Sequence, residues 1–429
     1  MRITVKNNMS RLAAVVIAAI VFVVLFVKVG RTYLAGVIAE KPVLKNFQTA
    51  MRLDPSDSQY ALSLGRTYQY SVQNADSDLA IKDLTRAVEL NSYNAQAWLD
   101  LGAALEFQGE NDQAEECMRR ADTLAPRIPD FQWAIGNFFL IHNNMQEAFR
   151  HFRMVLAGNA AYEEAIYNTA WKASGDGRVI LASLIPDSPG PEIDYLTYLL
   201  ASHRLSETGA VWDRIASSHE KFPAANTAFY LDVLIGSHQT DQAWNVWTTL
   251  REKGLIPSTY LPTPQNLVEN GNFENTLLGF GFGWRVAGVS GIYVGLDDSM
   301  YHSAAKSLLI QFPGNQNVEY HNVYQFVPVV PGHHYHLAVF MKTDSITTDS
   351  GPRIEVKDAY NPALLDKYSD QLTGTSPTWT PLTVDFEAGP KTDLVVIDIA
   401  RVASQEFANQ IAGKVWVDDV ALTPADKSE

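Results

Sequence analysis

Three patterns of hydrophobic and polar positions follow one another along the chain. Residues 12–27 form an unbroken apolar run. Between residues 40 and 256, apolar residues recur at the three- and four-residue spacing of amphipathic helices. After residue 264 they alternate with polar residues or form short runs between glycines and prolines, as in β-strands. We therefore predict a multidomain α plus β chain with an N-terminal transmembrane helix, an α-solenoid of helical hairpins and a C-terminal antiparallel β-sandwich.

Residues 12–30 are predicted to form a transmembrane anchor. The apolar run reaches 19 residues when Lys28 extends its side chain towards the membrane surface, and 19 helical residues measure about 28 Å. The alternative is a cleaved signal peptide with a small-residue site that ends at Ala39. We favour the anchor because the run is longer than a usual signal core and because Lys28 and Arg31 stand before that site.

The basic residues around this run predict a single-pass protein with its N-terminus inside. Three precede the run and three follow it, namely Arg2, Lys6, Arg11, Lys28, Arg31 and Lys41. The free amino group adds a positive charge to the first set, so the positive charges before the run outnumber those after it. Residues 1–11 are then a short cytoplasmic N-terminus, and the body is extracytoplasmic, or periplasmic in a two-membrane bacterium.

A 34-residue period marks the first half of the remaining chain. Gly136 lies 34 residues after Gly102, and Ala148 lies 34 residues after Ala114. The middle copy carries a set of small and large marker residues: Trp98, Leu101, Gly102, Leu105, Ala114, Met118, Ala121 and Pro126. An earlier copy carries a similar set: Ala61, Leu64, Gly65, Tyr68, Ala80, Leu84 and Ala87. These sets resemble the tetratricopeptide repeat, in which small residues let two antiparallel helices approach closely.

The resemblance weakens over 161–252, where further helical hairpins are predicted at 192–218 and 224–252. Glycines and prolines within 174–191 predict a break or a degenerate repeat before them. We place the solenoid at 40–256, because one repeat cannot bury its own apolar face and several must stack. A stacked solenoid offers a concave surface, so the resemblance implies a protein partner bound through the repeats.

The helical period ends after residue 256. Residues 257–264 contain three prolines and are predicted to be a linker, followed by a sandwich at 265–424 and a tail at 425–429. Stretches of strand length within the sandwich are apolar or alternating: 307–312, 322–330, 335–342, 353–358, 382–387, 393–401 and 414–422. Strands in this number without intervening helices predict two packed antiparallel sheets.

Four segments of this region resemble carbohydrate-binding modules. They are NLVENGNFE at 266–274 with a following Trp284, SLLI at 307–310, YQFVPV at 324–329 with a following Pro331, Gly332 and Tyr335, and VWVDDVAL at 415–422. Their order and spacing over 264–424 are similar to those of the jelly-roll carbohydrate-binding modules of families four and nine, which share a galactose-binding-like fold. The resemblance implies glycan binding, although the same sandwich also serves for other ligands or as a structural lid.

The resemblance also implies two kinds of site. A structural calcium ion (Ca2+) would be held by Glu274 and Asp418, with backbone carbonyls near 303–306; the alternative is that both carboxylates bind turn amides. A sugar would stack on an aromatic ring while an amide bonds its hydroxyl groups. The candidates are Trp284, Tyr293, Tyr320, Trp379 and Gln325, and core packing is the alternative role for each of them.

Charge and cysteine usage narrow the range of partners. The chain has a net charge of −15, and residues 1–39 contain five basic residues and no acid, so the acidic excess lies in the body. An acidic body repels phosphate backbones, and we expect no nucleic-acid partner. The single cysteine, Cys117, excludes an internal disulfide without fixing the compartment.

The sequence carries no motif of a common enzyme class. It lacks a Gly-rich phosphate loop, a GxSxG turn and an HExxH helix. His334 and His336 share one face of a predicted strand next to His333, but a third metal ligand at a suitable spacing is missing. We expect no catalytic residue and no required cofactor.

The combination of parts predicts a membrane-anchored extracytoplasmic scaffold. Its repeats would bind a protein and its sandwich a glycan, as in accessory proteins of exopolysaccharide or cell-surface polysaccharide assembly. One alternative is a purely structural subunit of an envelope complex, which an apolar and closed sheet face would favour. A second is a polysaccharide-processing enzyme, which would need clustered carboxylates in a cleft.

Overall fold

The computed structural model describes residues 8–158, 160–257, 263 and 265–425. Most of the predicted linker 257–264 lies outside this part of the chain, as do residues 1–7 and the predicted tail after Ala425. The chain divides into two compact units, the first of which ends at Pro186. The boundary falls within the segment 174–191, where the sequence predicts a break between helical hairpins.

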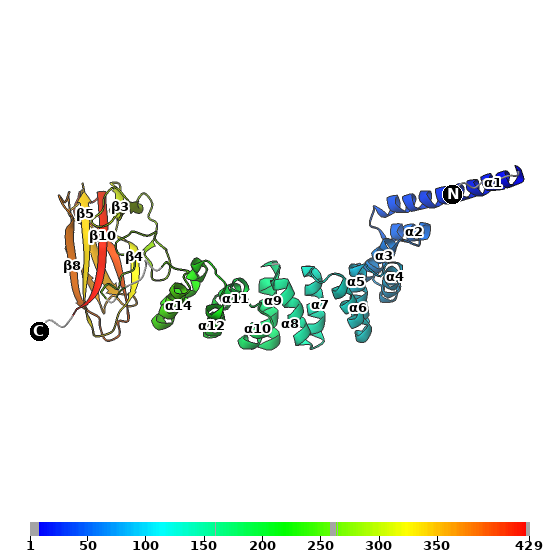
Figure 1. Ribbon diagram of the computed structural model, residues 1–429, viewed down its shortest axis with the longest axis horizontal. Helices are drawn as coiled ribbons and strands as arrows, with labels where there is room; N and C mark the ends of the chain where they lie inside the picture. The colour runs from blue at the N-terminus through cyan, green and yellow to red at the C-terminus, as the bar shows by residue number, and fades with distance from the viewer. Residues whose placement is uncertain (1–7, 159, 258–262, 264, 426–429) are drawn as a thin grey trace. The chain divides into compact units, whose positions relative to one another are not determined.

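Antiparallel helical hairpins build the first unit (Figure 1). Its described helices are α1 (Asn8–Ala39), α2 (Leu44–Leu53), α3 (Ser58–Tyr70), α4 (Ser77–Leu90), α5 (Ala95–Gln108), α6 (Asn111–Leu124), α7 (Pro129–Ile141), α8 (Met145–Leu156), α9 (Glu163–Ser174) and α10 (Gly177–Ser183), with a 3-10 turn at Ala160–Tyr162. The closest pairs are α3 with α4, α5 with α6 and α7 with α8. Because α5 and α7 begin 34 residues apart, the predicted period is confirmed as one hairpin per repeat.

Small residues let the two helices of a hairpin approach each other. A Cβ atom on Gly136 of α7 would lie 2.5 Å from the ring of Phe152 in α8. One on Gly65 of α3 would lie 2.5 Å from Leu84 Cγ in α4. Both large partners are fully buried. The interior has no room for an added methyl group at either glycine, which explains the small marker positions of the repeat.

Polar residues fix where several of these helices begin. Asp57, Asp76, Asn94 and Asn144 each accept a hydrogen bond of 2.8–3.2 Å from a backbone N–H of the following first turn. This cap satisfies a donor that has no partner within the helix. At the other end of α5, Gly109 adopts a left-handed conformation with φ of 84° and stops the helix.

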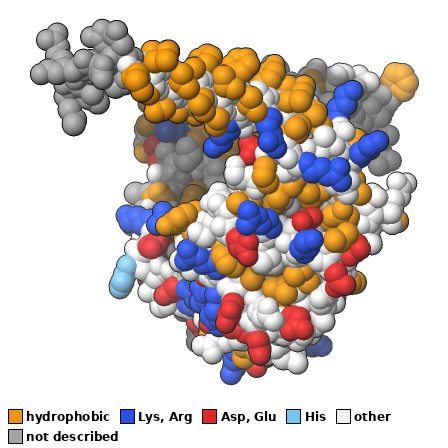
Figure 2. All heavy atoms as spheres, turned by 90° about the vertical axis from the view of Figure 1, so that its right-hand side faces the viewer, with side chains coloured by type: hydrophobic (Ala, Val, Ile, Leu, Met, Phe, Trp, Pro, Cys, Tyr) orange, Lys and Arg blue, Asp and Glu red, His pale blue; other side chains and the backbone are white. Residues whose placement is uncertain are grey.

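The last turns of α1 pack against α2 and α3, which we call the first hairpin. Ala35 is fully buried against Ala50 and Tyr60, and Thr32 Oγ1 donates a hydrogen bond of 2.8 Å to Asp54 Oδ2. The preceding turns expose their apolar side chains, and Figure 2 shows hydrophobic side chains gathered along α1. Within the described residues, α1 is the one helix long and apolar enough to cross a membrane, a property that signal sequences share.

Two more helical hairpins open the second unit, in agreement with the hairpins predicted at 192–218 and 224–252. They consist of α11 (Pro189–Ala201), α12 (Thr208–Ser217), α13 (Ala228–Gly236) and α14 (Thr240–Glu252), with 3-10 turns at Leu205–Glu207 and Ala224–Thr227. The strands of the sandwich follow: β1 (Arg285–Val286), β2 (Tyr293–Asp297), β3 (Ser307–Pro313), β4 (Tyr320–Pro328), β5 (His334–Asp344), β6 (Arg353–Asp358), β7 (Asp366–Tyr368), β8 (Thr380–Glu387), β9 (Leu394–Arg401) and β10 (Ala412–Ala425).

The described strands form two five-stranded sheets that face each other (Figure 1). The first sheet has the order β1-β4-β9-β6-β7 and the second β2-β3-β10-β5-β8, and all pairings are antiparallel. The predicted fold class, a solenoid followed by an antiparallel sandwich, is confirmed. The strands that the sequence pattern missed, β1, β2 and β7, have two, five and three residues, too few to display a clear alternation.

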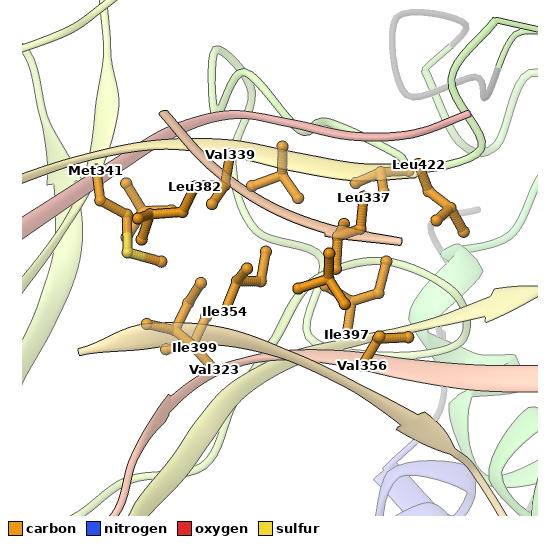
Figure 3. Packing of buried hydrophobic residues seen from close by; sticks show 14 of the residues in the cluster. Val323, Leu337, Val339, Met341, Ile354, Val356, Leu382, Ile397, Ile399 and Leu422 are labelled. Carbon is orange, nitrogen blue, oxygen red and sulfur yellow. The ribbon is translucent and has the colours of Figure 1, made fainter. Parts of the chain in front are cut away.

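The core of the sandwich lies between the sheets (Figure 3). It contains Val323, Ile354, Val356, Ile397 and Ile399 from the first sheet and Leu337, Val339, Met341, Leu382 and Leu422 from the second. Successive side chains of a strand point to opposite faces of the sheet. On the first sheet, the residues that alternate with the core residues therefore point outward. That outer face includes Tyr324, Glu355 and Asp398.

A packed contact joins the last helical hairpin to the sandwich. Trp247 of α14 is fully buried, donates a hydrogen bond of 2.7 Å from Nε1 to Glu269 Oε1, and meets the rings of Phe280 and Phe282 edge-on. Gly281, with φ of 58°, carries no side chain where a Cβ would lie 2.3 Å from the Trp247 ring. The loop before β1 and α14 therefore pack against each other in one buried contact.

Candidate functional site

Three residues predicted to contact a sugar lie in the interior of the sandwich. Trp284, Tyr320 and Gln325 are each at most 1% exposed. Gln325 binds the backbone of Glu269 twice, accepting from its N–H and donating to its carbonyl, both at 2.9 Å. Side chains this buried offer no surface to a glycan, so these three residues are corrected to core positions, the alternative role that the sequence left open.

The other two predicted sugar residues stay at the surface but do not form one platform. Tyr293 is 57% exposed on β2, and Trp379 is half-buried directly before β8. The strands β2 and β8 are the two opposite edges of the second sheet. A sugar of one or two rings could not stack on both, because neighbouring strands are about 4.8 Å apart and three strands separate these edges.

The carboxylates of Glu274 and Asp418 bind turn amides. Glu274 Oε1 accepts from the N–H groups of Ala305 and Lys306 at 2.9 and 2.8 Å. Asp418 Oδ2 accepts from two further amides of this turn at 2.8 and 3.0 Å, and its Oδ1 accepts from the N–H of Asp419. Since N–H groups are directed at both oxygens of Asp418, this residue does not fit a calcium shell, and the amide alternative describes the site.

The histidines of 333–336 form pairs rather than a metal centre. His336 Nδ1 lies 2.7 Å from Asp385 Oδ1, and His334 Nε2 lies 3.7 Å from Glu387 Oε2. Each pair is a direct cross-strand neighbour on β5 and β8. Within the described residues, the group of ligand atoms close enough to share a metal ion is a different one, on the first sheet.

A row of polar and aromatic side chains crosses the outer face of the first sheet, and we call it the sheet-one row. Strand register places Arg285 opposite Tyr324, Tyr324 opposite Asp398, Asp398 opposite Glu355, and Glu355 opposite Tyr368. Residues directly opposite each other in an antiparallel pair point to the same face. The row therefore contains one residue from each of the five strands.

Two basic side chains neutralise the charges of Glu355 and Asp398, the two acids at the centre of this row. His321 Nδ1 lies 2.8 Å from Glu355 Oε2 and 3.4 Å from Asp398 Oδ2. Lys357 Nζ lies 2.9 Å from the same Glu355 oxygen and 2.6 Å from the same Asp398 oxygen. His321 reaches this position because the register of β4 against β9 shifts between Tyr320 and Val323. We call these four residues the charged cluster.

The pKa values in the charged cluster keep all four groups charged at neutral pH. Hydrogen bonds with Asp398 and Glu355 raise the pKa of His321 to about 10, and burial raises the pKa of Asp398 to about 6. Burial opposes the ionisation of Glu355, but its hydrogen bonds outweigh this effect and hold its pKa below the ordinary value. Two positive and two negative charges then balance, which lowers the cost of burying them.

A metal ion does not fit the charged cluster. His321, Glu355 and Asp398 each offer a ligand atom, and these atoms lie within 4.8 Å of one another. However, the ammonium group of Lys357 already bridges both carboxylates at 2.6 and 2.9 Å. A second cation between the same oxygens would be repelled, so this arrangement is a hydrogen-bonded ion-pair network.

Aromatic rings surround the charged cluster. Tyr324 and Phe326 of β4 are half-buried and meet edge-on, with ring centroids 5.7 Å apart, and Tyr368 on β7 is 40% exposed. The Arg285 guanidinium lies 5.0 Å from the Phe326 ring centroid and donates to Asp232 of α13 at 2.7 Å. Ring faces beside fixed donors and acceptors are the groups that bind a sugar.

Sequence reasoning missed most of this face because its members come from five strands. Neither Glu355 nor Asp398 has a neighbour along the chain that marks it, and strand register alone brings them together. One local signal was present. Asp398 interrupts the apolar stretch LVVIDIA at 394–400, and an acid at a strand position this buried needs a positively charged partner.

The helical repeats carry a separate apolar hollow in the first unit. It has a volume of about 320 Å³ and lies between α3, α4 and α5, lined in part by Tyr68, Tyr70, Ala104 and Phe107. Phe107 is 82% exposed and Tyr70 is 59% exposed. Exposed aromatic rings at a concave surface are typical of protein-binding sites.

Comparisons with known proteins identify one of the helical hairpins. Residues 95–128, which include α5 and α6, match the tetratricopeptide repeat family. The chain contains a tetratricopeptide repeat. No curated protein matches the chain.

Among solved structures, MamA is similar over 27% of this chain, with 24% identity and a TM-score of 0.24. The chain spans about 65% of the length of that MamA structure. The C-terminal family 22 carbohydrate binding module of Clostridium thermocellum Xyn10B is similar over 39% of this chain and 99% of its own, with 16% identity and a TM-score of 0.27.

The CBM22-1-GH10 modules of Xyn10B, solved with xylohexaose, are similar over 37% of this chain and 29% of their own, with 14% identity and a TM-score of 0.28. Because all of these TM-scores are below 0.5, the likenesses do not decide which module family the sandwich belongs to. The fold assignment rests on the helices and sheets of this chain.

Proposed function

We propose that this chain is a membrane-anchored binding protein that holds a protein through its helical repeats and a glycan through the sheet-one row, without catalysing a reaction. The observation that carries the proposal is the row from Arg285 to Tyr368, with fixed charges at its centre and aromatic rings around them. From the basic residues around α1 we further propose that the rest of the chain lies outside the cytoplasm, and from the proposed glycan site that it takes part in cell-surface polysaccharide assembly.

The balance of charges favours binding over hydrolysis. A glycosidase needs a carboxylic acid that donates its proton and a second carboxylate free to act on the sugar or on water. Here Lys357 and His321 bind Glu355 and Asp398, and both acids are ionised at neutral pH. The buried acids hold His321 and Lys357 rigidly, and these two partly exposed side chains are the members of the cluster that can donate hydrogen bonds to sugar hydroxyl groups.

The packing of α1 supports a retained anchor. Cleavage after Ala39 would remove Ala35, whose burial against Ala50 and Tyr60 completes the first hairpin. It would also remove Arg31, whose guanidinium donates to the carbonyl of Leu53 at 3.1 Å. A segment that serves only as a cleaved signal has no need of contacts with the mature fold.

Binding of the full-length chain to a glycan array, followed by calorimetry on the best ligand, tests the proposal. Tyr324→Ala and Tyr368→Ala should each weaken binding by about threefold to tenfold, the value of one aromatic contact. Tyr293→Ala, an exposed tyrosine on the other sheet, is the matched control and should leave affinity unchanged.

Each other outcome of this experiment has a defined meaning. Binding lost only with Tyr293→Ala would move the glycan site to the second sheet. A folded protein without glycan affinity would favour the structural-subunit alternative. Release of shortened glycan from the bound ligand would overturn the non-catalytic assignment.

A further inference from the structure

A hollow of about 500 Å³ lies where α1 meets the turn between α2 and α3. One wall is α1, which contributes Val23, Val24, Val27, Lys28 and Arg31, and the other is the turn, which contributes Asp54. The three valines are more than half exposed. The three valines form the apolar floor of the hollow, and the two cations Lys28 and Arg31 form its charged rim together with the carboxylate of Asp54.

Hydrogen bonds hold the two walls of this hollow together. Arg31 donates from Nε to the Leu53 carbonyl at 3.1 Å and from Nη2 to the Arg52 carbonyl at 3.2 Å. Asp54 accepts from Thr32 Oγ1 at 2.8 Å and from Ser56 Oγ at 2.7 Å. The guanidinium group of Arg31 and the carboxylate of Asp54 are thus fixed by the fold before any ligand arrives.

The hollow spans the depth of a membrane interface. From Val23 to Arg31 the helix rises about 12 Å, which is more than the thickness of one polar interface of a bilayer. The valines lie at the end of the apolar run, and Lys28 follows it directly. If α1 crosses a membrane, the apolar floor faces lipid chains and the charged rim faces the headgroups.

We propose that this hollow binds one aminophospholipid of the phosphatidylethanolamine type, with its phosphate facing Lys28 and Arg31, its ammonium group facing Asp54, and an acyl chain along Val23, Val24 and Val27. The inference rests on the proposed membrane anchor. Charge complementarity selects the occupant, since two cations and one carboxylate match a phosphate that carries a primary ammonium group.

The carboxylate of Asp54 distinguishes this lipid from others with the same phosphate. Hydrogen bonds from Ser56 and Thr32 hold the pKa of Asp54 below its ordinary value, so it is ionised at neutral pH. A purely anionic headgroup such as phosphatidylglycerol would place no cation opposite it. A choline headgroup has a positive charge but no N–H donor for the carboxylate.

The test is native mass spectrometry of the full-length, delipidated protein in detergent, titrated with phosphatidylethanolamine, phosphatidylcholine and phosphatidylglycerol of identical acyl chains. We expect the first lipid to bind most tightly. Lys28→Gln should weaken it about fivefold, the value of one basic residue at a membrane surface. Asp54→Asn keeps an acceptor oxygen for Ser56 and places an NH2 group opposite the Thr32 hydroxyl oxygen, which can accept from it. This variant should reduce the preference over phosphatidylglycerol by a similar factor.

Matched controls are available close to the hollow. Lys41→Gln and Glu40→Gln change exposed charges directly after α1 that do not line the hollow, and they should leave all three affinities unchanged. Equal affinity for the three lipids, or the same preference in the Lys28 and Asp54 variants, overturns the lipid site.

Alkaline extraction of membranes that contain the full-length chain separates this inference from the anchor on which it rests. Release of the chain into the soluble fraction would overturn the anchor and the lipid site together. A chain that stays embedded but shows no lipid preference would overturn the lipid site alone.

Discussion

Asp398 shows how one charged residue organises a whole sheet face. It is 1% exposed in a strand whose other residues are all buried, so its charge must be compensated locally. Lys357 and His321 provide this compensation from β6 and β4, and Glu355 shares both partners. The strands that carry these residues are thereby linked by side-chain contacts as well as by their backbone hydrogen bonds.

The charged cluster makes the second unit sensitive to alkaline pH. A histidine whose pKa is about 10 in the folded state and about 6.5 unfolded stabilises the fold fully below pH 6.5, and this contribution is lost as the pH rises through 10. Because His321 is partly exposed, we discount the contribution for solvent screening to about 2 kcal/mol.

We therefore expect His321→Gln to lower the Tm of the second unit by about 4–8 °C at pH 7. Thermal unfolding of both proteins at pH 7, 9 and 10.5 checks this, and the gap should close at the highest pH. A gap of the same size at all three values would contradict the assigned pKa. His334→Gln is the control, because His334 is a half-buried histidine on the second sheet whose acidic neighbour Glu387 lies 3.7 Å away, and it should change little at any pH.

The helical hairpins depend on close contacts at the small marker positions. We expect Gly136→Ala to destabilise the first unit by about 1–3 kcal/mol, because the new methyl group would overlap the Phe152 ring in a packed interior. Gly158→Ala adds the same methyl group just after α8, where nothing lies closer than 4.0 Å, and should be nearly neutral.

Chemical unfolding of both glycine variants beside the parent protein measures the difference. If the two substitutions had equal effects, the close approach of α7 to α8 would not explain the small residue at this marker position.

Local sequence patterns were sufficient to predict the helical repeats and the long strands, but not the sheet-one row. The repeats could be found because Gly102 and Gly136 recur at a fixed distance, and the long strands because apolar residues alternate along them. Alternation does not tell which aromatic residue points inward, which is why Trp284 and Tyr320 were candidates both for a sugar contact and for the core. The charged cluster depends on strand register across β4, β6 and β9, which no short segment encodes.

At the scale of the whole molecule, the boundary between the two compact units does not coincide with the change from a helical to a strand-like sequence pattern after residue 256. Trp247 of α14 shares its core with Phe280 and Phe282 of the sandwich, although the proline-rich segment lies between them in sequence. The compact unit accordingly starts before α11.

We expect a fragment of residues 187–429 to be more stable than one of residues 263–429. Removal of α14 would uncover Phe280 and Phe282 and lose the burial of Trp247, which is worth about 3–5 kcal/mol, or about 10 °C in Tm. Calorimetric unfolding of the two fragments measures this, and Trp247→Ala in the longer fragment should reproduce most of the loss. Equal Tm values would mean that the sandwich is energetically independent of the helices.

No flexible joint separates the proposed anchor from the repeats, because the last turns of α1 pack against α2 and α3. Ala35 is buried in the first hairpin, so the helix cannot tilt without carrying α2 and α3 with it. A helix in a bilayer adjusts its tilt to the thickness of the hydrocarbon layer. A thinner or thicker membrane would then change the angle that the helical repeats of the first unit, with the apolar hollow between α3, α4 and α5, make with the membrane surface.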